Sequence, residues 1–228
     1  MNKTIAIITA RGGSKRIPRK NIKEFFGQPI IKYAIDAAIE SKLFDVVMVS
    51  TDDEEIAQIA KQHGADVPFM RSKETANDFA TTLDVLLEVM QEYKKINVEF
   101  DSLCCIYPCV PFLSGDMLVK AYDIFIKSEN DVLMPVVRFS YPIQRALRIN
   151  FDGLLEYVHP EHIKSRSQDL EAMYHDVGMF YFYKNNSLLK QNKTMKHFEM
   201  KESEIQDIDT EEDWRYAEMK YRILKETD

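Results

Sequence analysis

The chain has 228 residues, of which 45% are hydrophobic and 29% are charged, a balance that supports a sizeable core and excludes general disorder. The formal net charge of −7 argues against a general nucleic-acid binder. The apolar runs all fall short of the roughly 20 residues that span a bilayer. We therefore expect neither nucleic acid nor a membrane among the partners.

The N-terminus and the cysteines bear on where the protein works. Met1 is followed within a few residues by a short apolar strand with no small-residue cleavage site, which argues against a signal peptide. Cys104, Cys105 and Cys109 sit close together, and their odd number makes a poor disulfide framework. Paired Cys or His spacings for zinc are missing. We expect reduced thiols in a cytoplasmic protein.

Apolar strands and amphipathic helices alternate through the first half of the chain. Thr4–Thr9 has the composition of a buried strand, and Ile30–Ser41, behind Pro29, has the apolar spacing of a helix. Asp52 and Glu55 resemble a helix capping box. Further strands are expected at Asp45–Ser50, near Asp66–Met70, at Ser102–Tyr107 and at Asp131–Val137, and further helices before Gly64, at Thr82–Lys95 and at Met117–Ser128. This alternation predicts an α/β fold with a mostly parallel, Rossmann-like sheet and helices on both faces.

The alternation stops after Val137. Two short strand signals, Ala146–Ile149 and Leu154–Tyr157, flank an Asp152-Gly153 turn and predict a β-hairpin. Later strand and helix signals lie at Met179–Tyr183, at His197–Met200 and at Glu211–Lys225. We expect a single domain over residues 1–228, with residues 141–171 as a small inserted arm.

The strongest motif, A-R-G-G-S-K-R-I-P-R-K-N, directly follows the first strand and spans Ala10–Asn21. Two glycines let the backbone approach a phosphate group, and the stretch from Arg11 to Lys23 has six basic residues and no acid. Ligands of open α/β sheets gather at the carboxyl ends of strands, so we expect an anionic ligand here. The spacing fits neither a P-loop nor G-x-G-x-x-G. The alternative is a solvated basic loop, as most charge runs are.

This stretch resembles the N-terminal signature of the sugar-acid cytidylyltransferases, the CMP-sialic acid synthetase family. The resemblance implies that the loop holds the phosphates of CTP and that Asn21 faces the cytidine. Charge from Arg11, Lys15 and Lys20 would also stabilise the departing pyrophosphate, which gives these residues a catalytic role. The implied nucleotide contacts in the loop are Arg11, Gly12, Gly13, Ser14, Lys15, Lys20 and Asn21.

A second segment of the nucleotide site is expected where Arg71 ends the third strand and T-A-N-D-F-A-T-T follows. A loop of small, hydroxyl-bearing residues can read the edge of a base. The resemblance implies base contacts from Arg71, Ala80 and Thr82. The alternative is a helix N-terminus capped by Asp78, Thr81 or Thr82, and the two readings are compatible.

Asp207-Ile208-Asp209-Thr210 places two carboxylates at alternate positions. In an extended segment they point to one face, which suits Mg²⁺, because this ion takes one or two carboxylates together with phosphates and waters. The alternative is that Asp209 or Thr210 caps the last helix. In the resembled family the two aspartates hold the metal, which implies Mg²⁺ on Asp207 and Asp209, with Asp209 serving catalysis.

Two further segments are expected to bind the acceptor sugar. Tyr107 stands in the loop after the fourth strand, where sialic acid synthetases carry Gln. R-S-Q-D-L-E from Arg166 and Y-H-D-x-G from Tyr174 resemble the pseudaminic acid branch of the family. Arg166 could pair with a sugar carboxylate. His175 and Asp176 could orient the acceptor; the alternative is a structural His–Asp pair or a turn before Gly178. The implied sugar contacts are Tyr107, Arg166, Gln168, His175 and Asp176.

The resulting hypothesis is a cytidylyltransferase that couples CTP to the anomeric hydroxyl of a nonulosonic acid, pseudaminic acid foremost. A sister enzyme for legionaminic, sialic or a related ulosonic acid is the nearest alternative. A glycosyltransferase using Asp207-Ile208-Asp209 as its D-x-D, and a non-catalytic nucleotide-binding regulator, are alternatives of other classes. Residues 141–171 resemble the family's dimerisation arm, which implies a homodimer, although the segment could instead cover its own pocket. The resembled branch implies bacterial surface or flagellin glycosylation.

Overall fold

The computed structural model describes residues 3–227. A mixed seven-stranded sheet forms its centre, with the order β11-β6-β10-β5-β1-β4 and with β9 paired to β6 beside this path. The strands are β1 Thr4–Thr9, β4 Val46–Ser50, β5 Ser102–Ile106, β6 Val132–Arg138, β9 Tyr174–Asp176, β10 Phe180–Lys184 and β11 Met195–Met200. Short antiparallel ribbons are formed by β2 Glu24–Phe25 with β3 Gln28–Pro29 and by β7 Leu147–Ile149 with β8 Leu155–Tyr157.

Parallel pairing dominates the half of the sheet that the phosphate-loop motif follows. β1 lies between β4 and β5 and runs parallel to both, so Ile7 is opposite Met48 on one side and Cys105 on the other. β11 also runs parallel to β6, whereas β10 runs antiparallel to β5 and to β6. The carboxyl ends of β1, β4 and β5 therefore meet at one edge, where the N-terminal end of β10 joins them.

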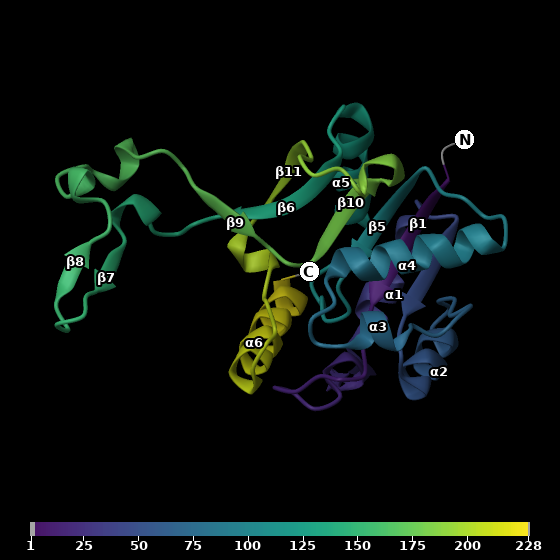
Figure 1. Ribbon diagram of the computed structural model, residues 1–228. Coiled ribbons are helices and arrows are strands. Elements are labelled where there is room, and N and C mark those ends of the chain that lie inside the picture. The colour runs from purple at the N-terminus through teal and green to yellow at the C-terminus, as the bar shows by residue number, and fades with distance from the viewer. Residues whose placement is uncertain (1–2, 228) are drawn as a thin grey trace.

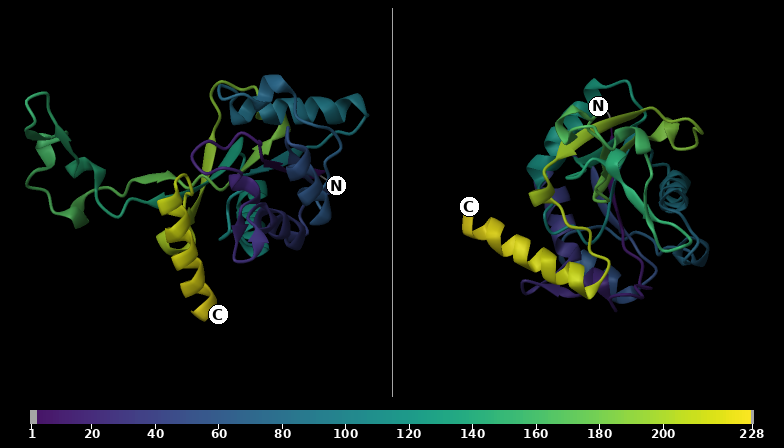
Figure 2. Two further views of the ribbon diagram at one scale, coloured as in Figure 1. Left: turned by 90° about the horizontal axis from the view of Figure 1, so that it is seen from below. Right: turned by 90° about the vertical axis from the view of Figure 1, so that its left-hand side faces the viewer.

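Helices cover both faces of the sheet, as the alternation predicts. Ile5 and Ile7 of β1 pack in the same core as Leu86 of α4, whereas Ala6 and Ile8 pack in the core that contains α1 and α5 side chains. Figure 2 shows the blue-teal α4 and the purple-blue α1 on opposite sides of the sheet. The helices are α1 Ile31–Ser41, α2 Glu54–Gln62, α3 Lys73–Ala76, α4 Thr82–Lys95, α5 Gly115–Lys127 and α6 Glu211–Thr227. Single 3₁₀ turns occupy Lys20–Ile22, Ile143–Arg145, Pro160–His162, Ser167–Asp169, Asn185–Ser187 and Glu202–Glu204.

Some of the sequence-based boundaries are wrong. The strand expected near Asp66–Met70 is reduced to a single bridge between Asp66 and Met48, because Pro68 has no N–H group to continue a ladder. α1 begins at Ile31, while Pro29 lies in the β2–β3 ribbon.

The cap of α2 is also one residue later than expected. Its N-cap is Asp53, whose carboxylate accepts the Ile56 N–H, and not Asp52. Asp52 instead accepts a hydrogen bond from the backbone N–H of Gly12 at 2.9 Å. The side chain that seemed to start a helix therefore holds the beginning of the phosphate-loop motif.

The predicted hairpin is confirmed and forms part of a projecting arm. β7 and β8 pair around Asp152 and Gly153, and Gly153 adopts the positive φ of 78° that such turns need. At the base of the arm β6 pairs with β9, which brings Arg138 opposite Tyr174. The intervening residues stand away from the sheet in Figure 1 and in the left-hand view of Figure 2. None of the helices within residues 3–227 is both long and apolar enough to cross a membrane.

Candidate active site

A cavity of about 660 Å³ opens at the edge where the parallel strands end. Thr9 at the end of β1 and Tyr107 just after β5 form part of its wall, and Gly178 lies just before β10. The segment before α6 supplies the opposite wall. The residues that line it are Thr9, Arg11, Ser14, Lys15, Arg16, Ile17, Lys20, Asn21, Tyr107, Pro108, Cys109, Gly178, Asp207, Ile208 and Asp209. The cavity thus combines the phosphate-loop motif, the carboxylate pair and one expected sugar residue.

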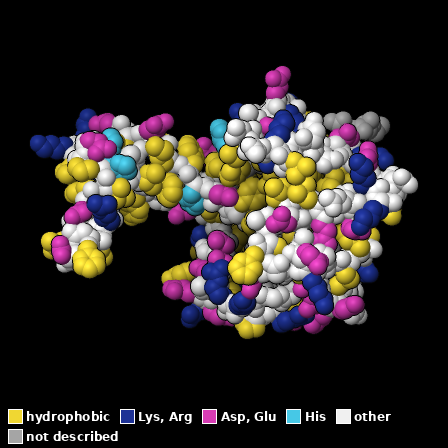
Figure 3. Space-filling view, viewed as in Figure 1, with side chains coloured by type: hydrophobic (Ala, Val, Ile, Leu, Met, Phe, Trp, Pro, Cys, Tyr) yellow, Lys and Arg dark blue, Asp and Glu magenta, His cyan; other side chains and the backbone are white. Residues whose placement is uncertain are grey.

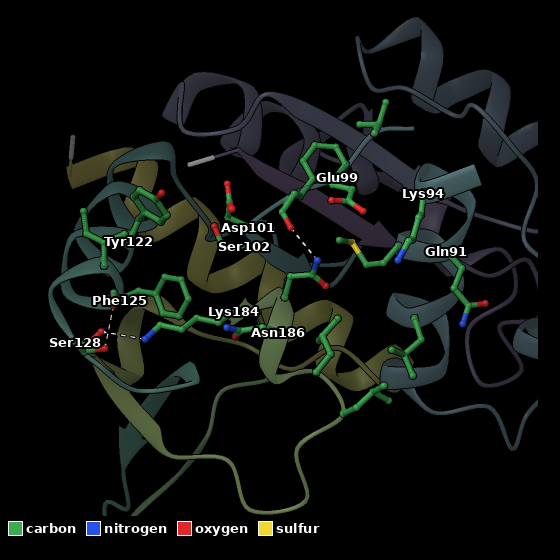
Figure 4. Close-up of a pocket in the computed structure, with 18 residues that line it drawn as sticks. Gln91, Lys94, Glu99, Asp101, Ser102, Tyr122, Phe125, Ser128, Lys184 and Asn186 are labelled. Carbon is green, nitrogen blue, oxygen red and sulfur yellow. Dashed lines mark hydrogen bonds between the residues drawn. The ribbon is translucent and has the colours of Figure 1, made fainter. Parts of the chain in front are cut away.

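A second hollow, of about 720 Å³, lies at the other edge of the sheet, near the start of β5 and the end of β10. Lys94, Glu99, Ser102, Tyr122 and Lys184 are among the side chains that surround it (Figure 4). This hollow contains none of the site residues predicted from the sequence. We therefore place the candidate active site in the smaller cavity.

The cations of the phosphate loop meet a carboxylate from another segment. Asp78, in the loop before α4, accepts hydrogen bonds from Arg11 at 3.0 Å and from Lys15 at 2.5 Å. The hydrogen bond from Lys15 is the main reason that the pKa of the Asp78 carboxyl is lowered. Lys15 keeps 75% of its side chain exposed, so it is free to turn toward a bound anion.

On the opposite wall the loop meets the carboxylate pair. Arg16 lies 2.9 Å from Asp209, and the Lys20 ammonium donates to the Ile208 carbonyl at 2.6 Å and reaches Asp209 at 3.5 Å. Burial, together with the nearby charge of Asp209, raises the pKa of Asp207. Two carboxylates that repel each other beside a basic loop form a site where a cation would relieve the repulsion.

The helix-cap alternative for this pair is settled in favour of Thr210. The Thr210 hydroxyl accepts the Asp213 N–H at 3.2 Å, and the Asp213 carboxylate accepts the Thr210 N–H at 2.7 Å. These reciprocal bonds form a capping box at the start of α6. The Asp209 carboxylate has no part in it and lines the cavity instead.

Not every basic residue of the motif serves the cavity. Lys23 pairs with Glu211 at 2.7 Å and lies 4.5 Å from the centroid of the Trp214 ring. Arg19 pairs with Asp53 and Glu55. The six cations predicted to make one positive pocket are therefore divided: Arg11, Lys15, Arg16 and Lys20 line the cavity, whereas Arg19 and Lys23 do not.

The neutral residues of the loop are held by hydrogen bonds. Asn21 is buried, and its amide donates to the Arg11 carbonyl at 2.8 Å and accepts from the Cys109 thiol at 3.3 Å. Burial raises the pKa of Cys109 to about 12, so the thiol keeps its proton and donates. Gly12 donates to Asp52, and a side chain added at Gly13 would meet no heavy atom within 4 Å. Ser14, like Asn21, lines the cavity.

None of the three residues expected to read the base lines the cavity, and only Thr82 touches a residue that does. Arg71 is buried, and its guanidinium donates to the side chain and carbonyl of Ser50 at 3.0 and 2.6 Å, away from the cavity wall. Ala80 donates its N–H to the Asn77 side chain. Thr82 contacts the Tyr107 hydroxyl at 3.3 Å. Arg71 thus fixes the end of β4 in this structure.

The capping alternative in this segment is also resolved. Thr81, with Asp84, forms the capping box of α4. Asp78 is bound to the phosphate loop, and Thr82 is the first residue of the helix. The neighbouring Thr82 hydroxyl is therefore left for the contact with Tyr107, at the rim of the cavity.

The expected sugar residues fall into two groups. Tyr107 lines the cavity, and Asp176 lies close by, where it accepts hydrogen bonds from Tyr181 at 2.8 and 2.7 Å and from the Gly178 N–H at 2.9 Å. His175 contacts the Asp176 carbonyl and not its carboxylate, so of the two structural alternatives the turn before Gly178 is found and the side-chain His–Asp pair is not. The acid instead orders the turn that brings Gly178 to the cavity.

The other group belongs to the arm. Arg166 pairs with Asp169 at 2.9 Å, and Gln168 lines a separate hollow at the base of the arm with Arg138 and Glu202. Neither side chain lines the cavity of its own chain. Among the cavity-lining residues that sequence reasoning did not name as contacts are Arg16 and Cys109. Arg16 stands within the basic motif, and Cys109 follows a strand end, but neither position distinguishes them from their neighbours.

Comparison with known proteins identifies the kind of protein that carries this site. The family model described as cytidylyltransferase matches residues 5–227. The chain belongs to the cytidylyltransferase family. It is therefore an enzyme, a nucleotidyltransferase that uses CTP, which excludes the glycosyltransferase and the non-catalytic regulator.

Individual relatives agree with the family. The chain is 40% identical, over 99% of both chains, to a pseudaminic acid cytidylyltransferase of Campylobacter jejuni. It is 35% identical to N-acylneuraminate cytidylyltransferase A of Danio rerio, over 96% of this chain and 50% of that one. A solved CMP:2-keto-3-deoxy-manno-octonic acid synthetase in complex with CTP superposes with a TM-score of 0.72, at 19% identity, over 98% of this chain and 99% of that one. The last likeness supports the fold.

Lys20→Ala should lower kcat/KM for CTP on the order of 10²- to 10³-fold, because it removes a preorganised cation from the cavity. Steady-state pyrophosphate release measures this effect. Lys23→Ala is the matched control, since Lys23 is a lysine of the same motif that pairs with Glu211 outside the cavity. Equal losses in the two variants would contradict the placement of Lys20.

Proposed function

We propose that the chain transfers CMP from CTP to the anomeric hydroxyl of a nonulosonic acid, pseudaminic acid, and releases pyrophosphate. The observation that carries this proposal is the 40% identity to a pseudaminic acid cytidylyltransferase over nearly the full length of both chains. Tyr107 in the cavity wall supports it, because the sialic acid enzymes that the sequence resembles carry Gln there. The product is a CMP-activated sugar for a bacterial surface glycan, and a flagellin modification protein of Campylobacter coli is 32% identical.

The chemistry follows from the cavity. The sugar hydroxyl attacks the α-phosphorus, a new P–O bond forms as the hydroxyl proton is released, and the bond to the β-phosphate oxygen breaks with its electron pair on pyrophosphate. Arg11, Lys15 and Lys20 stabilise the charge on the departing group, and Arg16 stands beside them. No covalent intermediate on the protein is needed. CTP displaces Asp78 from Arg11 and Lys15, which exposed ion pairs permit at little cost.

Mg²⁺ is the proposed cofactor, held by Asp207 and Asp209. Among the described residues, no group of three or more His, Cys, Asp and Glu side chains could hold a metal by itself. Mg²⁺ nevertheless fits, because it takes one or two protein carboxylates and fills its other positions with phosphate oxygens and waters. Burial raises the pKa of Asp207 most, and the charge of Asp209 adds to it; a bound cation would remove that repulsion. When bound, Mg²⁺ would neutralise the phosphate charge.

A homodimer formed through the arm would complete the sugar side of the site. The arm exposes large apolar side chains, an unfavourable arrangement for a free surface (Figure 3). They include Tyr141 at 85%, Ile149 at 73%, Leu155 at 67% and the fully exposed Phe151. Arg166 and Gln168 do not line the cavity of their own chain, so a sugar contact would require them to enter the cavity of a second copy. We place the enzyme in the cytoplasm, in line with its three free cysteines.

Incubation of the chain with CTP, Mg²⁺ and a panel of sugar acids tests the proposed function. Pseudaminic acid should give the highest kcat/KM for pyrophosphate release, and legionaminic and sialic acids lower values. A higher kcat/KM with legionaminic or sialic acid would show that this acid, and not pseudaminic acid, is the substrate. Absence of pyrophosphate release with every nonulosonic acid would refute the proposal.

Asp209→Asn should raise the Mg²⁺ concentration for half-maximal activity by more than about 10-fold, because one charged metal ligand is lost. A titration of pyrophosphate release against Mg²⁺ measures this. Glu212→Gln is the control, since Glu212 is an exposed acid on α6 that binds Tyr216. An Asp209→Asn enzyme with an unchanged Mg²⁺ requirement would exclude Asp209 as a ligand.

Ile149→Asp together with Phe151→Asp should convert a dimer into a monomer, because charge at the hairpin opposes burial between copies. Light scattering coupled to size-exclusion chromatography measures the mass. Ile96→Asp, at an exposed apolar position at the end of α4, is the control and should stay dimeric. A monomeric unmodified chain would refute the dimer.

A further inference from the structure

Arg19 has an unusual backbone conformation for a residue with a side chain. Its φ of 56° and ψ of 28° lie in the left-handed region, which favours glycine. It directly precedes the 3₁₀ turn Lys20–Ile22, and its carbonyl accepts the N–H groups of Ile22 and Lys23, both at 3.0 Å. This conformation sends Lys20 and Asn21 toward the cavity, while Arg19 itself does not line it.

The side chain of Arg19 is bound at its far end by acids of another segment. Its guanidinium donates to both carboxylate oxygens of Asp53, to Oδ1 at 3.0 Å, and to Glu55. Asp53 is only 21% exposed. The hydrogen bond between Arg19 and Asp53 is the main reason that the pKa of Arg19 is raised and the pKa of Asp53 is lowered. This bidentate pair is therefore charged and directional.

Asp53 belongs to a short turn that touches the phosphate loop twice. Asp53 caps α2 through the Ile56 N–H at 3.0 Å, which fixes the turn to a helix. The adjacent Asp52 accepts the Gly12 N–H at 2.9 Å. A Cβ atom at Gly12 would lie 2.8 Å from Asp53 Oδ2, so the loop passes directly against this carboxylate. The turn after β4 thus holds the loop near its beginning, at Gly12, and near its end, at Arg19.

We propose that Arg19 and Asp53 are positioning residues that set the phosphate loop for CTP without touching the nucleotide. With the Asp52–Gly12 bond, the Arg19–Asp53 pair fixes the two ends of the loop, next to Arg11 and Lys20, which line the cavity. Holding the loop in one conformation removes the ordering cost from the binding step. This inference rests on the use of CTP by the enzyme.

Three substitutions separate this role from general stability. Arg19→Gly removes the guanidinium and supplies the residue that favours the observed φ, so backbone strain does not contribute to a loss. Arg19→Lys keeps a cation but loses the bidentate bond. Asp53→Asn keeps an N-cap acceptor for α2 and removes the charge. Lys42→Gly is the matched control, because Lys42 has the same φ of 56° at the end of α1, outside the cavity.

Calorimetric titration of the full chain with CTP and Mg²⁺, without sugar acid, gives the affinity, and Tm is measured on the same samples. Arg19→Gly and Asp53→Asn should each weaken CTP binding on the order of 10- to 100-fold, as misplaced binding groups do, with the Tm of Arg19→Gly near that of Lys42→Gly. The double variant should bind no worse than either single one, and Arg19→Lys should recover part of the loss.

Arg19→Gly with the affinity of the unmodified chain would overturn the proposal, and so would additive losses in the double variant. A loss of affinity accompanied by an equal loss in Lys42→Gly would do the same. If the unmodified chain does not bind CTP, the proposed function fails. If the unmodified chain binds CTP and Arg19→Gly binds it equally well, only the role of Arg19 fails.

Discussion

The site depends on one electrostatic constraint, which is that the basic loop after β1 is compensated by carboxylates from separate parts of the chain. Asp52 and Asp53 follow β4, Asp78 precedes α4, and Asp209 precedes α6. A loop with this density of positive charge would repel itself if its cations were unpaired. The parallel strand β4 brings Asp52 and Asp53 to the edge where β1 ends, and the segments before α4 and α6 bring Asp78 and Asp209 there.

These ion pairs differ in how easily a ligand can replace them. Lys15 and Asp78 are 75% and 45% exposed, and exposed pairs contribute only about 0–1 kcal/mol. A triphosphate carries more charge than one carboxylate and can take the place of Asp78. Asp53, by contrast, is mostly covered and also caps α2. The pairs therefore divide into those that ligands exchange and those that maintain the shape of the loop.

Much of the fold and the chemical identity of the site could be predicted from the sequence. β1 has every second residue in one core and the alternate residues in the other, and such apolar runs are visible in the sequence. The Gly-Gly motif and the D-I-D-T segment do come together, although 187 residues separate Lys20 from Asp207. The resemblance to a family guided this pairing, because local periodicity contains no information on long-range contacts.

The errors concern side chains whose partners are distant in the sequence. Asp52 and Asp53 are equivalent as helix caps by local rules, and only the passage of Gly12 beside them decides which one caps α2. The resemblance implies that Arg71 contacts the nucleotide base. In the structure Arg71 instead donates to the hydroxyl and the carbonyl of Ser50 at the end of β4. Arg19 reads as one more cation in a basic run, and its left-handed backbone has no local signature.

The pairing of β6 with β9 separates two parts of the molecule that evolution can treat differently. Because Arg138 lies opposite Tyr174, the chain leaves the sheet and returns to it at neighbouring points. The length and composition of the excursion can then change without moving the strands that carry the nucleotide site. A lineage could therefore vary this appendage, and any contact that it makes, while the strands around the cavity keep their positions.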